Sequence, residues 1–374
     1  MSNTEKYIAY FWASRLCRGR NDTYETLVNV FGSPEEAWRQ CGNGAGAVEI
    51  PQEEKNARLI SERISDPNLR EAAVRAVGNA EKAGIGMITA DDENYPDLLK
   101  IFPGKPLILF YEGEIGRINR CVSRLAVVGS RNSTAYGRDT TDRLITGISG
   151  FDVCVVSGMA RGIDYCAHRA ALDNGLFTAA VLGCGTNVVY PPENVGIYKK
   201  IRENGVIISE FPPDTQPYKS NFPARNRIIA GISEATMVVE AGLTSGALIT
   251  ADYSLDAGRD VLAVPHRIDV PGGTGVNSLI KCGAVCVTSS SDILTALGLE
   301  TEDDGEKAKG FIMDDALDEK QKTVLAFISE NGEAFEDDIS DAKGLMPQDV
   351  KKALSALEIG GFVKRSSVGS YSVR

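Results

Sequence analysis

The chain has 374 residues, 43% of them hydrophobic, and carries 40 basic and 51 acidic side chains for a formal net charge of −11. That length predicts two or three domains, and the apolar fraction excludes a mostly disordered chain. Because no run of about 18 apolar residues occurs and the first residues lack a basic segment followed by an apolar run, we predict a cytoplasmic protein with no membrane span and no secretory leader.

The N-terminal part of the chain has apolar side chains at the spacing that is typical of helices. In the stretch TYETLVNVFGSPEEAWRQ, Leu27, Val28 and Phe31 share one helix face, and Ser33-Pro34 is a typical start for a second helix. Another periodic stretch follows between residues 51 and 83. We therefore predict a helical domain over residues 1–83.

From residue 85 onward, short β-branched runs alternate with helical stretches. Most of these runs are continuously apolar, which is typical of parallel strands buried on both faces. Strands that alternate with helices predict an open, doubly wound α/β sheet, to which we assign residues 84–300. The runs are IGMITA, PLILFYEG, RLAVVGS, DVCVVSG, TAAVLG, GVIISE, TMVVEA, DVLAVP and AVCVTSS.

The negative charge is concentrated near the C-terminus. Residues 300–343 hold 15 acidic and 5 basic side chains, and the charged, turn-rich stretch 301–318 predicts a linker. Beyond it the pattern predicts helices over 320–330 and 336–342, a third helix from Pro347, and a small terminal hairpin. Three helices and a hairpin are typical of a winged-helix domain, which we assign to residues 319–374.

Glycine-rich turns follow the central strands, and an open α/β sheet binds its ligands at the carboxyl ends of its strands. Gly129-Ser130-Arg131 leads into a helix, where backbone N–H groups and an arginine could hold a phosphate. Ser157-Gly158 begins a second turn of this kind. The alternative for the first turn is a plain strand-to-helix connection with a solvated arginine.

Other reactive side chains do not form a catalytic or metal-binding pattern. Asp164 and His168 share one helix face, but no nucleophile accompanies them, so we interpret them as a hydrogen-bonded structural pair. The eight cysteines include no CxxC pair, and only two histidines are present. We predict no metal, no cofactor and no structural disulfide, with Cys154, Cys166 and Cys184 as small core residues.

The segment 218–227, YKSNFPARNR, has the highest density of binding chemistry. Its lysine and arginines could take phosphates, while Phe222 offers a face on which a base could stack. Single strands are held in this way, with about 1–3 kcal/mol per stacked base. The alternative is that Phe222 lies in the core and the arginines pair with Glu210 or Asp214.

A series of motifs between residues 85 and 296 resembles the DNA-processing protein DprA (Smf) family, and FPARNRIIAGIS is the most specific of them. LVNVFGSPEEAW resembles the family's N-terminal helical, SAM-like domain, and the C-terminal helices and hairpin resemble an extra winged-helix domain of many members. The motifs are, in order, AVVGSRNSTAYGR, SGMARGIDYCAHRAAL, YPPEN, SEFPP, FPARNRIIAGISEATMVVEA, SGALITA, GRDVLAVP and GVNSLIKCGA.

This resemblance implies an extended Rossmann fold that binds single-stranded DNA, forms a homodimer and loads the RecA recombinase during natural transformation, without being an enzyme. It implies that Arg131 binds phosphate, that Lys219 belongs to the basic pocket and that a base stacks on Phe222. The RNR motif, which we expect to form a basic loop that binds phosphates, and the 157–158 loop lie beside them. The implied DNA-binding residues are Gly129, Ser130, Arg131, Ser157, Gly158, Lys219, Phe222, Arg225, Asn226 and Arg227.

Three further patterns bear on alternative functions. The N-terminal domain has CRGRNDTYE where family members often have a Gly-x-Gly hairpin, so helix–hairpin–helix binding is not predicted there. LOG-like nucleotide phosphoribohydrolases carry PGGxGTxxE, but Leu279 stands in place of that glutamate. A winged-helix regulator of duplex DNA could use Lys351 and Lys352, but the acidic residues before them favour docking to a protein or oligomerisation.

Overall fold

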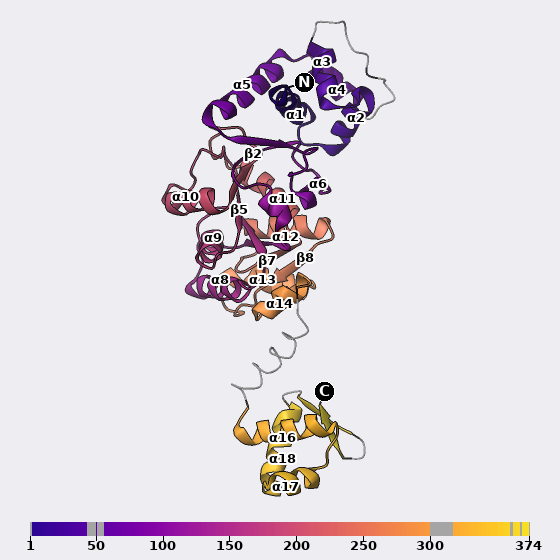
Figure 1. Cartoon of the computed structure of the whole chain (residues 1–374), viewed down its shortest axis with the longest axis vertical. Helices are drawn as coiled ribbons and strands as arrows, with labels where there is room; N and C mark the ends of the chain where they lie inside the picture. The colour runs from indigo at the N-terminus through magenta and orange to yellow at the C-terminus, as the bar shows by residue number, and fades with distance from the viewer. Residues whose placement is uncertain are drawn as a thin grey trace. The chain divides into compact units, whose positions relative to one another are not determined.

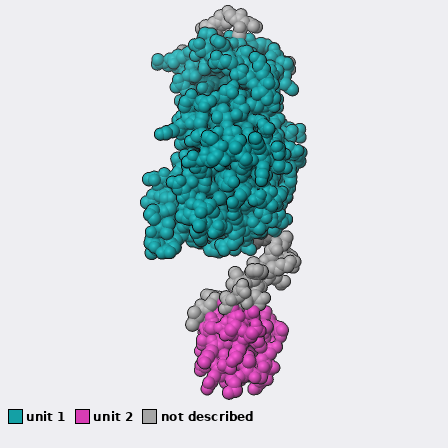
Figure 2. Space-filling view, turned by 90° about the vertical axis from the view of Figure 1, so that its left-hand side faces the viewer, with its two compact units in different colours: residues 1–299 teal, residues 300–374 magenta. Residues whose placement is uncertain are grey.

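A nine-stranded sheet organises the N-terminal 299 residues, and a smaller helical unit follows it. The structure is a computed structural model, which describes residues 2–42, 50, 56–299, 317–359, 362–366 and 369–373. Residues 1–299 and 300–374 form two compact units (Figure 2). The predicted linker, 301–318, lies outside the described residues except for its last two. Among the described helices, none is long and apolar enough to cross a membrane.

The sheet has the strand order β1-β2-β6-β5-β4-β3-β7-β8-β9 (Figure 1). β2 pairs antiparallel with both β1 and β6, and all other neighbours are parallel. The predicted α/β class with a mostly parallel sheet is therefore confirmed. The strands are β1 (Gly86–Thr89), β2 (Ile108–Gly113), β3 (Ser123–Val128), β4 (Val153–Ser157), β5 (Thr178–Val181), β6 (Val206–Ser209), β7 (Ala235–Val238), β8 (Asp260–Ala263) and β9 (Val285–Cys286).

Helices cover both faces of this sheet, which explains why its central strands are continuously apolar. Every residue of β3 to β7 is buried. One face packs against α6, α11, α12 and α13, and the other against α8, α9, α10 and α14. The helices are α6 (Asp97–Lys100), α7 (Arg117–Arg120), α8 (Ala135–Gly147), α9 (Ile163–Asp173), η1 (Pro192–Asn194), α10 (Val195–Asn204), α11 (Asn221–Ile232), α12 (Gly246–Asp256), η2 (Pro271–Gly273), α13 (Thr274–Lys281) and α14 (Ser290–Ala296).

Among the described residues, five helices precede the sheet, and their apolar core is continuous with its antiparallel edge (Figure 1). The Asp66 side chain caps the start of α5, and Gly84, at φ 66°, ends it in the left-handed conformation that glycine favours. The rings of Phe11 and Phe110 join α1 to β2, with centroids 5.9 Å apart. The helices and the sheet thus share one unit, and the boundary at 83/84 stays a prediction. The helices are α1 (Asn3–Cys17), α2 (Asn21–Phe31), α3 (Pro34–Gly42), α4 (Ala57–Ile64) and α5 (Pro67–Ala83).

In its described residues, 317–359, 362–366 and 369–373, the C-terminal unit contains three helices and an antiparallel two-stranded sheet around its own apolar core. These elements follow the predicted order, and the assignment to the winged-helix class stays a prediction. The elements are α16 (Glu319–Asn331), α17 (Glu336–Lys343), α18 (Pro347–Ile359), β10 (Val363–Arg365) and β11 (Tyr371–Val373).

Candidate nucleic-acid interface

A pocket of about 720 Å³ lies where the strand order reverses. The reversal is at β3, which has β4 on one side and β7 on the other, and this switch point is where open α/β sheets bind ligands. The turn after β3, the loop after β7 and the first turns of α11 line the pocket, which we call the switch-point pocket. Of the predicted DNA-binding residues, it brings together Gly129, Ser130, Arg131, Lys219, Phe222, Arg225 and Asn226.

Two exposed cations lie beside a half-buried aromatic ring in this pocket. The guanidinium carbon of Arg131 is 5.4 Å from the ring centroid of Phe222, and the ring centroids of Tyr190 and Phe222 are also 5.4 Å apart. Across the described residues, no carboxylate is within ion-pairing distance of Arg131 or Lys219. Phe222 packs directly over Gly183, where a Cβ would be 3.0 Å from the ring. The pocket therefore combines positive charge with the Phe222 ring, whose position is restricted by its packing against Gly183.

The turn after β3 is held mainly by contacts within the protein. A Cβ on Gly129 would lie 2.6 Å from the Ile163 side chain, so glycine lets α9 approach β3. The backbone N–H of Ser130 already donates to the Glu240 carbonyl at 2.7 Å, and its hydroxyl accepts from Asn132. This N–H is occupied, so in this turn Arg131 is the exposed charged donor.

The start of the second turn, Ser157-Gly158, is engaged in contacts within the protein. The Ser157 side chain is fully buried, and its hydroxyl donates to the Val127 carbonyl at 2.6 Å. Gly158 donates its N–H to the Asp164 carboxylate, and a Cβ there would lie 2.5 Å from Arg225. Neither residue lines the pocket, so the structure does not place this predicted part of the interface within reach of a ligand.

The RNR motif, which we expected to form a loop, lies within α11, and this corrects the prediction. Arg225 is only 3% exposed, and its guanidinium donates to the carbonyls of Gly158, at 2.8 Å, and Val181. Arg227 forms an ion pair with Glu210 at 2.6 Å, as the alternative interpretation of the sequence had it. Consecutive side chains leave a helix in different directions, which separates the three residues. Asn226 lines the pocket but donates to the Gly246 carbonyl.

Two residues of the pocket lining, Arg225 and Asp164, are buried and titratable. Burial lowers the pKa of Arg225 to about 10, opposed by the Asp164 carboxylate, so Arg225 stays charged at neutral pH. Burial also raises the pKa of Asp164, while Arg225 lowers it. The predicted Asp164–His168 pair is wrong, because the His168 Nδ1 bonds the Thr178 hydroxyl at 2.7 Å instead. The hydrogen bonds from Arg225 to the Gly158 and Val181 carbonyls hold α11 against the 158–164 turn, and the Asp164 carboxylate acts on the guanidinium only through its charge.

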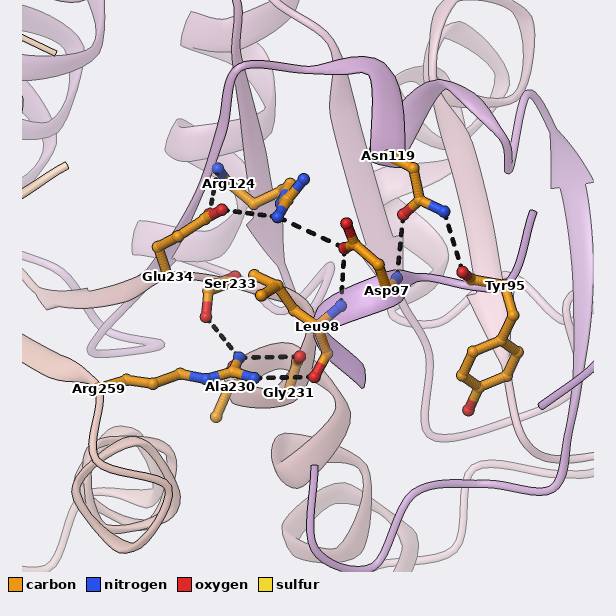
Figure 3. Close-up of polar contacts among 10 residues, drawn as sticks. All are labelled: Tyr95, Asp97, Leu98, Asn119, Arg124, Ala230, Gly231, Ser233, Glu234 and Arg259. Atoms are coloured by element: carbon orange, nitrogen blue, oxygen red, sulfur yellow. Dashed lines mark hydrogen bonds and ion pairs between the residues drawn. The ribbon is translucent and has the colours of Figure 1, made fainter. Parts of the chain in front are cut away.

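Arg259 anchors the other end of α11, a role that sequence analysis missed (Figure 3). Its guanidinium donates to the carbonyls of Ala230, Gly231 and Ser233, which close the C-terminal end of the helix. It also donates to the carbonyl of Leu98, at 2.9 Å. A cation at a helix C-terminus satisfies carbonyls without partners and complements the helix dipole. The helix that carries Phe222 is therefore fixed at both ends.

Sequence analysis also missed Tyr190 and the loop 242–246 as parts of the pocket. Both follow strands, β5 and β7, whose carboxyl ends meet at the same edge of the sheet. That position was a usable signal, because ligands bind at this edge.

Comparisons with known proteins identify a family and two related structures. A family model described as DNA recombination-mediator protein A matches residues 86–298. Protein Smf of Synechocystis sp. is 34% identical over 316 residues, which are 83% of this chain and 77% of that protein. The X-ray structure of DNA processing protein A (DprA) from Streptococcus pneumoniae is 36% identical with a TM-score of 0.57, covering 63% of this chain and 84% of that one. A structure concerning the single-stranded DNA binding mode of DNA processing protein A from Helicobacter pylori is 26% identical with a TM-score of 0.52, covering 57% and 95%.

Proposed function

This chain belongs to the DNA recombination-mediator protein A family, and from that membership we propose that it binds single-stranded DNA through the switch-point pocket. The observation that carries the proposal is that two exposed cations, Arg131 and Lys219, lie in one pocket with the half-buried ring of Phe222 and have no carboxylate partner among the described residues. The relative from Helicobacter pylori, which is described as binding single-stranded DNA, supports the same conclusion.

In the proposed complex, Arg131 and Lys219 bind phosphates, and a base stacks on Phe222. Arginine can hold a phosphate with two parallel hydrogen bonds, whereas lysine acts as a point charge. Stacking on an aromatic ring accepts any base, because every base has a π-face. Binding is therefore expected to depend on strandedness and salt and only weakly on base sequence. Arg225 and Arg227 keep their protein partners and act by positioning α11.

The finer parts of the proposal concern assembly. Two chains form a homodimer that presents two pockets to one strand, and the second contact gains affinity through effective concentration. The covered strand then serves as a loading platform for the RecA recombinase in natural transformation. The family's description as a recombination mediator supports this step. Its test is RecA ATP hydrolysis on a strand covered by a single-strand binding protein, and no acceleration by this chain would refute the loading step.

The test of binding is fluorescence anisotropy of labelled oligo-dT, competed with unlabelled duplex and repeated at several salt concentrations. We expect binding that duplex does not displace and that weakens steeply with salt. If duplex competes as well as single-stranded DNA, the DNA-binding site would have to be sought in the C-terminal unit and not in the switch-point pocket. An absence of binding at low salt would overturn the proposal and make release of a base from a nucleoside monophosphate the next assay.

A further inference from the structure

A second cleft of about 720 Å³ lies between the N-terminal helices and the sheet, within the same compact unit. One wall is the turn between α1 and α2, together with α4, and the floor is the segment that leads into β2. The opposite wall is the first two turns of α11. We call it the helical cleft.

The helical cleft is strongly basic. Among the described residues, its lining contains one carboxylate, Glu210, and that group is already paired with Arg227. Arg20 pairs with Asp22, which lies outside the cleft lining. The lining cations are Arg15, Arg18, Arg20, Arg63, Lys105 and Arg227.

Four of these cations have no carboxylate partner among residues 2–42 and 56–299 as far as the structure describes them: Arg15, Arg18, Arg63 and Lys105. Arg15 and Arg18 are exposed at the rim. Arg63 donates to the Arg15 carbonyl, but among the described residues its buried Nε has no hydrogen-bond partner. A buried donor without a partner costs about 1–3 kcal/mol, and a cleft lined by one sign of charge concentrates its field. Both features favour an anion in the cleft.

The helical cleft and the switch-point pocket share the start of α11. Phe222, Pro223 and Asn226 line the switch-point pocket, while Asn221, Ala224 and Arg227 line the helical cleft. These two sets lie on adjacent faces of one helix, since residues three or four apart share a face. A helix with its side chains is about 10–12 Å across, so a flexible strand can pass from one site to the other around this helix within a few nucleotides.

We propose that the helical cleft binds the sugar–phosphate backbone of the same single strand whose base stacks on Phe222. This inference rests on the proposed function, and it adds the N-terminal helices to the DNA path. The phosphates would contact Arg15 and Arg18 at the rim and Arg63 deeper in the cleft. The contact is purely with the backbone and uses no helix–hairpin–helix motif. The Arg227–Glu210 pair, with the bond from Arg227 to the Gly104 carbonyl, keeps the cleft floor against α11.

The test compares two strand lengths with the double variant Arg15→Gln/Arg18→Gln in the full chain. An oligo-dT of about six nucleotides fills little more than one site, and one of about 20 exceeds the usual size of a single-strand site. We expect the variant to bind the short strand like the unaltered protein. For the long strand we expect about tenfold weaker binding at physiological salt and a salt slope smaller by about 1.4, because each lost phosphate contact removes about 0.7.

The matched control is Arg75→Gln/Lys82→Gln, which removes the same charge from exposed positions on α5 outside the cleft lining. It should leave both affinities and the salt slope unchanged. If the unaltered protein binds both strands and the cleft variant loses nothing on the long one, the cleft inference is overturned while the proposed function stands. If the control loses as much as the cleft variant, general charge and not the cleft explains the effect. Failure of the unaltered protein to bind either strand would instead overturn the proposed function.

Discussion

Replacing Phe222 by alanine tests the stacking part of the proposed interface most directly. The ring is half-buried against Gly183 and beside Tyr190, so a base can cover only its free surface. Alanine substitution at stacking positions costs about 1–3 kcal/mol per base. We expect the lower part of that range, about 1–2 kcal/mol, because part of the ring is already covered.

At 1.4 kcal/mol per tenfold change, this loss corresponds to binding about 5- to 30-fold weaker. The assay is anisotropy titration of labelled oligo-dT at fixed salt. Phe222→Tyr keeps the ring and is expected to keep the affinity. Phe335→Ala, which removes an aromatic side chain that is 48% exposed in the C-terminal unit, is the control for general loss of aromatic surface.

The same substitution also removes the contact of Phe222 with Arg131, worth about 0.5–1 kcal/mol at an exposed site. A double-mutant cycle of Phe222→Ala and Arg131→Ala separates the two effects, since coupled positions are not additive. Thermal unfolding of each variant shows whether the protein is folded under the assay conditions. A folded Phe222→Ala protein that binds within about twofold of the unaltered one would refute the stacking argument.

Three other outcomes are expected. Arg131→Ala should reduce the salt slope of oligo-dT binding by about 0.7, and an unchanged slope would move the phosphate contact elsewhere. Arg225→Ala should lower the free energy of unfolding by about 1–3 kcal/mol, because the buried carbonyls of Gly158 and Val181 lose their guanidinium donor. Denaturant unfolding measures this loss, and a change below about 0.5 kcal/mol would contradict the structural role of Arg225. Burial lowers the pKa of His168 to about 3, below the usual value of 6.5. Between pH 3 and pH 6.5 the imidazole is therefore protonated in the unfolded chain but neutral in the folded one. Stability should therefore fall as pH drops below about 6.5, by up to about 1.4 kcal/mol per unit from this group, and His168→Asn should flatten that slope.

The order of elements was readable from the sequence. The continuous apolar runs predicted the strands because β3 to β7 are covered on both faces. The turns after β3 and β4 could be predicted from their glycines, because a helix packs closely against each turn. At Gly129, for example, a side chain would collide with Ile163. Periodicity reports such burial directly, since it depends only on which side of an element faces the core.

The availability of each charge could not be predicted in the same way. Arg131 and Arg227 look alike in the sequence, yet the first is exposed in the pocket and the second is paired with Glu210. The Asp164–His168 prediction was wrong for the same reason. Helix spacing shows which side chains can meet, but it does not show which hydrogen-bond partner each of them has in the folded protein. The imidazole of His168 instead forms a hydrogen bond with the hydroxyl of Thr178, on β5.

The sequence by itself determined the sheet, the helices around it and the turns at which a ligand could bind, because local periodicity and glycine positions encode these features. Only the tertiary structure decided which side chains are exposed at those turns. The Arg225 guanidinium donates hydrogen bonds to the carbonyls of Gly158 and Val181, at the ends of two different strands, and is therefore buried. The basic helical cleft likewise arises because folding brings the α1–α2 turn opposite α11, about 200 residues further along the chain. Pairing and burial depend on such distant neighbours, and no local pattern records them.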